Sequence, residues 1–297
     1  MSARRVRIES IGVSPPRRGP LRWGWGSLRH TVAAGRRCLG ASRHRPADVG
    51  LLVNAGVHRD DHVCEPAGAA YIQHRLGVNV EFQGRPTLSF DLLDGGCGML
   101  DAASVVAALL ESGEAEAGMV VAGEANSDRR PDPSWTFPAS GAALLLDCSP
   151  TRTAGFGGFA ARTRDEHADA ITSVVSLAQP RGRLLLHRDP RAEEIWLTMA
   201  GEAAAEALER DDLSLREVDL VVPAQISGAF LGRLPGSLGI TAEKVFDISG
   251  RLADTLSTSV VLALDAAMQQ GRTPPGTRAL LLAFGSGLTV SAATYRF

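Results

Sequence analysis

Residues 89–123 read SFDLLDGGCGMLDAASVVAALLESGEAEAGMVVAG, and residues 245–285 read VFDISGRLADTLSTSVVLALDAAMQQGRTPPGTRALLLAFG. Each stretch starts with Phe-Asp at the end of a strand and turns through an elbow that contains glycine. Each then continues as a long apolar helix and, after a glycine-bearing turn, ends in another apolar strand. This shared order predicts a duplicated unit of strand, elbow, helix and strand.

A second pair of segments lies just before the first pair in each half of the chain. Residues 33–56 (AAGRRCLGASRHRPADVGLLVNAG) and 203–225 (AAAEALERDDLSLREVDLVVPAQ) both read as a helix, a polar linker, an acidic turn and a buried strand. Two matched pairs in matched order predict two α/β halves, residues 1–160 and 161–297, that form one compact unit around central helices apolar on most faces.

Short apolar runs between the amphipathic stretches predict buried strands. These runs are Val49–Val53, Met119–Ala122, Ala143–Leu146, Val218–Val222 and Ala279–Phe284, and helices are predicted at Leu100–Ser112 and Ile195–Arg210. Alternation of strand and helix predicts an α/β fold with largely parallel sheets.

Composition excludes several classes of function. A formal net charge of −2 gives no basic field for nucleic acid. No apolar run reaches the roughly 18–20 residues that span a bilayer, and MSARRVRIES at the start lacks the apolar core of a signal peptide, so we expect a cytoplasmic protein. The 4 cysteines form no CxxC pair, which argues against a zinc site or a disulfide framework.

Two further motifs do not indicate a functional site from the sequence alone. The run His58–His62 (HRDDH) contains metal-ligand residue types but lacks helical spacing, so we predict no metal there. Ser140-Gly141 is not a GxSxG elbow and has no histidine nearby in sequence, which argues against a serine hydrolase.

Cys97 stands in the first elbow, in Gly95-Gly96-Cys97-Gly98. A helix that begins directly after a strand points its N–H groups and its positive dipole end at the residues before it. Such a field lowers the pKa of a cysteine and stabilises an oxyanion. Cys97 is therefore a candidate nucleophile, and the alternative is a small residue at a crowded junction.

The chain resembles β-ketoacyl-ACP synthase III-like proteins of the thiolase superfamily over most of its length. The segments that carry the resemblance are RIESIGVSPP (7–16), SFDLLDGGCGML with ALLESGEAEAGMVVAGE (89–100 and 108–124), FPASGAALLL (137–146) and the closing residues 262–297. The resemblance implies the thiolase fold, with duplicated α/β halves in five layers, αβαβα.

The resemblance also implies an acyl-enzyme on cysteine, assisted by a histidine and an asparagine. Aligned on Phe90-Asp91 and Gly98, the nucleophile position falls on Gly96, one residue before Cys97. Ala224 stands at the histidine position and cannot exchange a proton. Asp254 stands at the asparagine position, where a carboxylate would disfavour the enolate formed on decarboxylation.

Further implications of the resemblance concern the tunnel and the partners. The residues expected at the oxyanion site and tunnel are Gly96, Gly98, Gly285, Ser286 and Gly287. We expect acyl-CoA or the phosphopantetheine of acyl-ACP as the acyl donor, no tightly bound cofactor, and a homodimer or a heterodimer with a homologue. The substrate cover is trimmed to PPRRGPLRWGWG, where Arg17, Arg18 and Arg22 could attract phosphopantetheine or an acidic carrier protein, or be simply solvated.

Two hypotheses follow for fatty-acid or polyketide-type metabolism. In the first, the chain is a catalytically degenerate subunit that pairs with an active homologue, because no histidine lies close to Ala224 in sequence. In the second, it is an acyltransferase or thioester hydrolase that uses Cys97 as nucleophile, with Asp254 as a polar or basic partner. Both hypotheses place residues 96–97, 224 and 254 around one buried point that lacks an imidazole.

Overall fold

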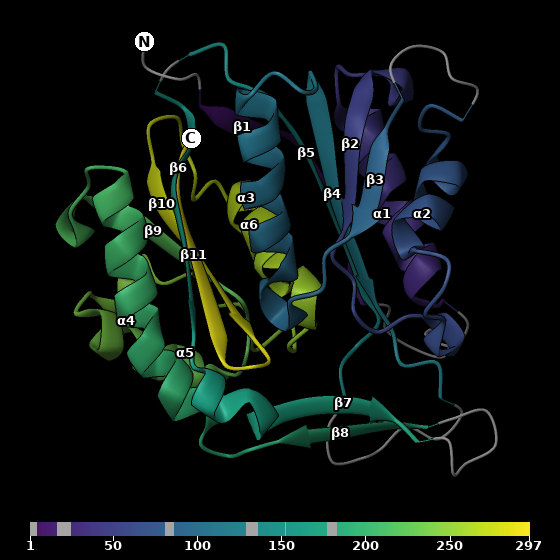
Figure 1. The fold of residues 1–297 in the computed structure, drawn as a ribbon. Coiled ribbons are helices and arrows are strands. Elements are labelled where there is room, and N and C mark those ends of the chain that lie inside the picture. Colours follow the sequence, from purple (N-terminus) through teal and green to yellow (C-terminus); the bar gives the residue numbers. More distant parts are fainter. Residues whose placement is uncertain (1–4, 17–24, 81–85, 129–135, 152, 177–182) are drawn as a thin grey trace.

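Two mixed β-sheets form the frame of the computed structural model (Figure 1). The structure describes residues 5–16, 25–80, 86–128, 136–151, 153–176 and 183–297. The first sheet has the order β1-β5-β4-β2-β3. Its strands are β1 (Val6–Ser14), β2 (Val49–Asn54), β3 (Leu88–Asp91), β4 (Ala117–Glu124) and β5 (Ser140–Cys148).

The second sheet repeats this arrangement with strands from the other half of the chain. Its order is β6-β11-β10-β9, formed by β6 (Gly155–Thr163), β9 (Leu220–Pro223), β10 (Arg278–Gly285) and β11 (Thr289–Arg296). An isolated parallel bridge from Val221 to Val245 stands where β3 pairs with β2 in the first sheet. A hairpin of β7 (Ile171–Val175) and β8 (Leu184–Arg188) leaves this frame and runs beneath both sheets in Figure 1.

Helices fill the space between the sheets and cover their outer faces (Figure 1). The central helices α3 (Gly98–Glu111) and α6 (Ser259–Gln269) pack between the sheets. The outer helices are α1 (Ser27–Ala41) and α2 (Gly68–Leu76) on the first sheet, and α4 (Ala192–Arg210) and α5 (Gly228–Leu238) on the second. The layers therefore follow the predicted order αβαβα. Within the described residues, none of these helices is both long and apolar enough to cross a membrane.

Burial explains why these segments form strands and central helices. Every residue of β4 is buried, and in β10 only Arg278 is partly exposed, so each strand reads as a continuous apolar run. The central helices bury most of their length because they meet a sheet on either side. This packing brings the start of α3 and the loop before α6 to the same level of the molecule.

The predicted strands and helices are confirmed, and the sheet type needs a correction. All five predicted apolar runs lie in or overlap β2, β4, β5, β9 and β10, and the two predicted helices correspond to α3 and α4. The sheets are mixed rather than largely parallel, because β5 and β11 are antiparallel to both of their neighbours. The expected boundary at residue 160 falls inside β6, which pairs in the second sheet, and the division into halves stays a prediction.

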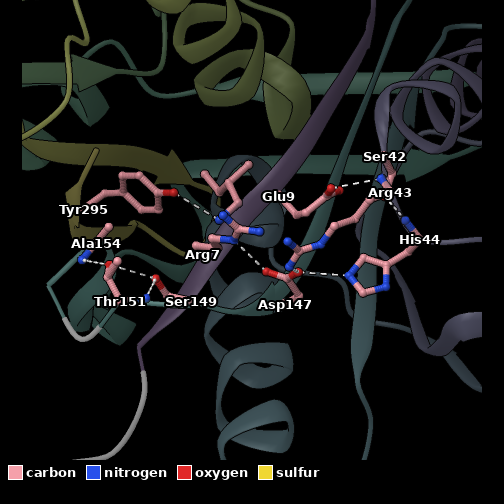
Figure 2. Close-up of polar contacts among 11 residues, drawn as sticks. Arg7, Glu9, Ser42, Arg43, His44, Asp147, Ser149, Thr151, Ala154 and Tyr295 are labelled. Carbon is pink, nitrogen blue, oxygen red and sulfur yellow. Dashed lines mark hydrogen bonds and ion pairs between the residues drawn. The ribbon is translucent and has the colours of Figure 1, made fainter.

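One buried carboxylate holds the first strand to the rest of its sheet (Figure 2). Asp147 on β5 is 2% exposed, and its oxygens accept hydrogen bonds from Arg7 on β1 at 2.9 Å and from Arg43. The His44 Nε2 atom lies 2.9 Å from the same carboxylate. Three basic groups around one acid fix the end of α1 against β1 and β5.

Candidate acyl-binding cavity

A small cavity of about 70 Å³ lies where the first elbow, the loop before α6 and the β7–β8 hairpin meet. The polar residues and glycines that line it and enter the argument are His58, Gly96, Ser173, Arg188, Asp254 and Ser286. Apolar walls come from Ile171, Trp196, Leu256 and Phe284. A cavity with apolar walls and a few converging polar groups is the usual form of a small-molecule site.

The elbow reaches this cavity through glycine rather than through a side chain. Gly95 has φ +50°, and the 3₁₀ turn η4 (Gly95–Cys97) leads directly into α3. A Cβ atom added to Gly96 would lie 2.0 Å from the carbonyl oxygen of Phe284, well inside contact distance. The position that the alignment assigns to the nucleophile therefore has room only for glycine in this backbone.

The Cys97 thiol lies in the core behind this wall, and Cys97 is not among the residues that line the cavity. Its side chain is 0% exposed, and its Sγ atom donates to the carbonyl oxygen of Thr289 at 3.5 Å. Its Sγ atom and one carboxyl oxygen each of Asp94 and Asp101 lie within 4.8 Å of one another.

The expectation that the helix end lowers the pKa of this thiol is wrong. Burial raises the pKa of Cys97 well above its ordinary value, and the neighbouring Asp101 raises it further. The pKa of Asp101 is itself raised to about 8, first by burial and then by Asp94. A thiol in such surroundings remains protonated and is a poor nucleophile.

The other two predicted catalytic positions, Asp254 and Ala224, differ in their relation to the cavity. Asp254 lines the cavity beside Gly96, whereas Ala224 is 1% exposed and does not line it. The Ala224 backbone N–H donates to the carbonyl oxygen of Leu282 in β10, two residues before Phe284. Burial raises the pKa of Asp254 to about 6, although its Oδ1 atom accepts a hydrogen bond from the Leu256 backbone.

The residues expected at the oxyanion site and tunnel also divide into two groups. Gly96 and Ser286 line the cavity, and Gly98, Gly285 and Gly287 do not. The Gly285 carbonyl oxygen accepts a hydrogen bond from Trp196 Nε1 at 3.2 Å, which holds the indole at the cavity wall.

The main correction to the sequence reading is His58, because an imidazole does line the cavity. His58 follows β2, and its Nδ1 atom lies 2.8 Å from an oxygen of Glu124 at the end of β4. Strands β2 and β4 are parallel neighbours, so residues at their carboxyl ends meet. The sequence did contain a signal for this pair: His58 follows the apolar run of β2, and Glu124 ends the apolar run of β4. The signal was missed because HRDDH was considered as a motif by itself.

The remaining predicted groups lie elsewhere. His62 lies 3.1 Å from Asp128, so the two histidines of HRDDH face different carboxylates. Ser140 is fully buried, and its hydroxyl pairs with that of Thr258 at 2.8 Å. The basic candidates Arg17, Arg18 and Arg22 lie outside the described residues.

Comparisons with known proteins define the class of the chain. A family model for the C-terminal part of 3-oxoacyl-[acyl-carrier-protein] synthase III matches residues 208–297. The chain superposes on the synthase III FabH of Pseudomonas aeruginosa PAO1 with a TM-score of 0.85 at 21% identity, covering 99% of this chain and 98% of that one. It also superposes on the priming β-ketosynthase of the R1128 polyketide biosynthetic pathway with a TM-score of 0.83 at 24% identity, covering 100% and 97%. These likenesses identify the thiolase fold that the sequence predicted.

Sequence identity then gives the family. The β-ketoacyl-[acyl-carrier-protein] synthase III of Sodalis glossinidius is 31% identical over 249 residues, which cover 78% of this chain and 73% of that protein. The chain belongs to the β-ketoacyl-ACP synthase III family.

Proposed function

We propose that this chain is a ketosynthase III-like protein of acyl-thioester metabolism that does not perform decarboxylative condensation, and that it pairs with a homologue that does. The observation that carries the proposal is the elbow at Gly96. A Cβ atom there would lie 2.0 Å from a backbone oxygen, so no cysteine can present its sulfur to the cavity from this position without a shift of β10.

Two further positions support the loss of condensation. Ala224 offers no proton at the position where the family resemblance implies histidine. Asp254, with a pKa of about 6, is mostly ionised at neutral pH, and its charge would oppose the enolate that decarboxylation of a malonyl group forms. The cavity keeps apolar walls that suit an acyl chain while the family's condensing groups are missing from it.

An assay of condensation tests this part of the proposal. The purified protein is incubated with acyl-CoA and ¹⁴C-carboxyl-labelled malonyl-ACP, and released ¹⁴CO₂ and 3-oxoacyl-ACP are measured beside a homologue with the Cys-His-Asn set. We expect neither product above background, including from the variant Ala224→His, because no thiol faces the cavity. Condensation by the unmodified chain would refute the proposal.

Pairing is supported by the free edge of the first sheet. Within the described part of the chain, β3 has a partner on one side only, and an edge strand of this kind is a template for another chain. Leu88 on this strand is 57% exposed and Leu93, just after it, is 56% exposed. Large apolar groups at a sheet edge are typical of a subunit interface.

Co-expression with a Cys-His-Asn homologue encoded in the same genome tests the pairing. We expect a 1:1 complex by size-exclusion chromatography with light scattering, which Leu88→Lys abolishes. The matched control is Leu185→Lys, because Leu185 is 39% exposed on the separate β7–β8 hairpin. A chain that stays monomeric or only self-associates in the presence of the homologue would exclude this role.

Acyl transfer on Cys97 remains the alternative function. The resemblance favours it, whereas the burial and raised pKa of the thiol weigh against it. Intact-mass spectrometry after incubation with acyl-CoA tests it, since a Cys97-dependent acyl adduct is required.

A further inference from the structure

Three side chains from separate parts of the chain form a hydrogen-bonded line at the cavity. The Ser173 hydroxyl on β7 lies 3.1 Å from His58 Nε2, and His58 Nδ1 lies 2.8 Å from Glu124. Ser173 and His58 both line the cavity, beside the elbow glycine Gly96. Serine, imidazole and carboxylate in this order are the arrangement that activates a serine hydroxyl for acyl transfer.

The surroundings of Glu124 set the tautomer of His58. Glu124 is 0% exposed, and its oxygens accept hydrogen bonds from the backbone N–H groups of Val57 and His58 at 3.0 Å each, and from the Ser257 hydroxyl. Carboxylate oxygens only accept hydrogen bonds, so the remaining partner, His58 Nδ1, donates to Glu124. The other ring nitrogen, Nε2, then accepts the hydrogen bond of the Ser173 hydroxyl.

Packing holds the imidazole and the hairpin in place. The ring of Phe137 lies 4.7 Å from that of His58, centroid to centroid. Phe137 also joins Leu184 and Leu186 of β8 in a small apolar cluster, which seats the hairpin beneath the cavity. Ile171 and Ser173 both line the cavity, as alternation along β7 requires. The serine is therefore positioned by a paired strand rather than by a free loop.

We propose that Ser173 and His58 are the catalytic residues of a thioester hydrolase at this cavity, with Glu124 as the positioning residue. This inference rests on one part of the proposed function, namely that the cavity binds the acyl group of a thioester. The α3 terminus reaches the same cavity through Gly95 and Gly96, and Arg188 also lines it, so both offer positive potential to an oxyanion.

The reaction has two balanced halves. Ser173 Oγ attacks the thioester carbonyl carbon while its proton passes to His58 Nε2, and the C–S bond then breaks as that proton moves to the departing sulfur. This half leaves an acyl ester on Ser173 and a free thiol. Water then attacks the ester carbon, His58 takes the water proton and returns it to Ser173 Oγ, and the C–O bond breaks. The sum is thioester plus water giving carboxylic acid plus thiol.

Hydrolysis of butanoyl-CoA, whose short acyl group suits a cavity of about 70 Å³, tests the inference in the purified chain, with thiol release followed by Ellman's reagent. We expect turnover that falls by about 10²–10⁴-fold in Ser173→Ala and His58→Ala. Glu124→Gln should lower kcat and leave KM close to that of the unmodified chain, a split that a general loss of structure would not give. The matched control is Thr172→Ala, the neighbouring residue whose side chain points to the other face of β7.

A second measurement covers any variant that fails to fold. A fluorophosphonate probe should label the native chain, and peptide mass spectrometry should place the label on Ser173. Ser173 is exposed, so Ser173→Ala should keep its circular dichroism spectrum and melting temperature while it loses the label. Absence of both thiol release and label from the native chain would overturn the inference, as would turnover that depends on Cys97 and survives Ser173→Ala. Failure of the proposed function is read separately, as ¹⁴CO₂ release in the condensation assay.

Discussion

The substitution Asp254→Asn should stabilise the protein at neutral and alkaline pH. Burial at the cavity raises the pKa of this carboxyl from 3.8 to about 6. A raised pKa means that the folded state favours the protonated acid, so this contribution to stability is fully present below about pH 4 and is lost as the pH rises through 6. A shift of roughly two pKa units corresponds to about 3 kcal/mol of unfolding free energy, as an upper value. Asparagine is neutral at every pH and can still accept the hydrogen bond from the Leu256 backbone.

Urea unfolding followed by circular dichroism, at intervals from pH 4 to pH 8, measures this effect. The variant and the unmodified chain should have similar free energies of unfolding at pH 4, and the variant should gain up to about 3 kcal/mol by pH 7. Asp48→Asn serves as the control of opposite sign, because the hydrogen bond from Arg45 lowers the pKa of Asp48. A variant less stable than the unmodified chain at pH 8 would show that burial does not dominate the pKa of Asp254.

Three other predictions concern groups outside the cavity. Iodoacetamide at pH 8 should modify the exposed Cys64 and spare Cys97 in the native chain, and peptide mass spectrometry that finds Cys97 modified first would contradict its burial. Asp147→Asn should cost about 1–3 kcal/mol at pH 7, less than a fully buried pair because Arg43 is 57% exposed. Burial alone raises the pKa of Asp147, but bonds from its basic partners lower it overall, so this cost should shrink in urea titrations as the pH falls below about 4. Asp101→Asn should flatten the loss of stability from about pH 4 to about pH 8 that a pKa raised from 3.8 to about 8 implies for the acid, and an unchanged pH profile would refute it.

The apolar pattern predicted the buried strands and central helices because burial on both faces leaves a clear signal, whereas the family resemblance implied the five layers. Apolar runs such as Met119–Ala122 and Ala279–Phe284 can only be interior strands, and the matched elbows at Gly96 and Asp254 fixed the duplication. The direction of a strand could not be predicted in this way, because a buried apolar strand has the same sequence pattern in a parallel and in an antiparallel pair. The mixed sheets were missed for this reason.

The cavity could be predicted only in part, because its polar groups come from distant segments. The family resemblance assigned Gly96 and Asp254 to one site. Glu124 and Ser173, however, lie 66 and 115 positions after His58 along the chain. A sequence motif does not record such contacts. The environment of Cys97 was also hidden, because burial is the main cause of its raised pKa, and Asp101, one helical turn further on, adds to it; both depend on packing.

The contact between the first elbow and β10 has a consequence for protein engineering. A cysteine introduced at Gly96 would collide with the Phe284 carbonyl before its sulfur could meet a substrate. A designed variant with a thiol at this elbow therefore needs a second change that moves the β10 backbone at Phe284 away from Gly96.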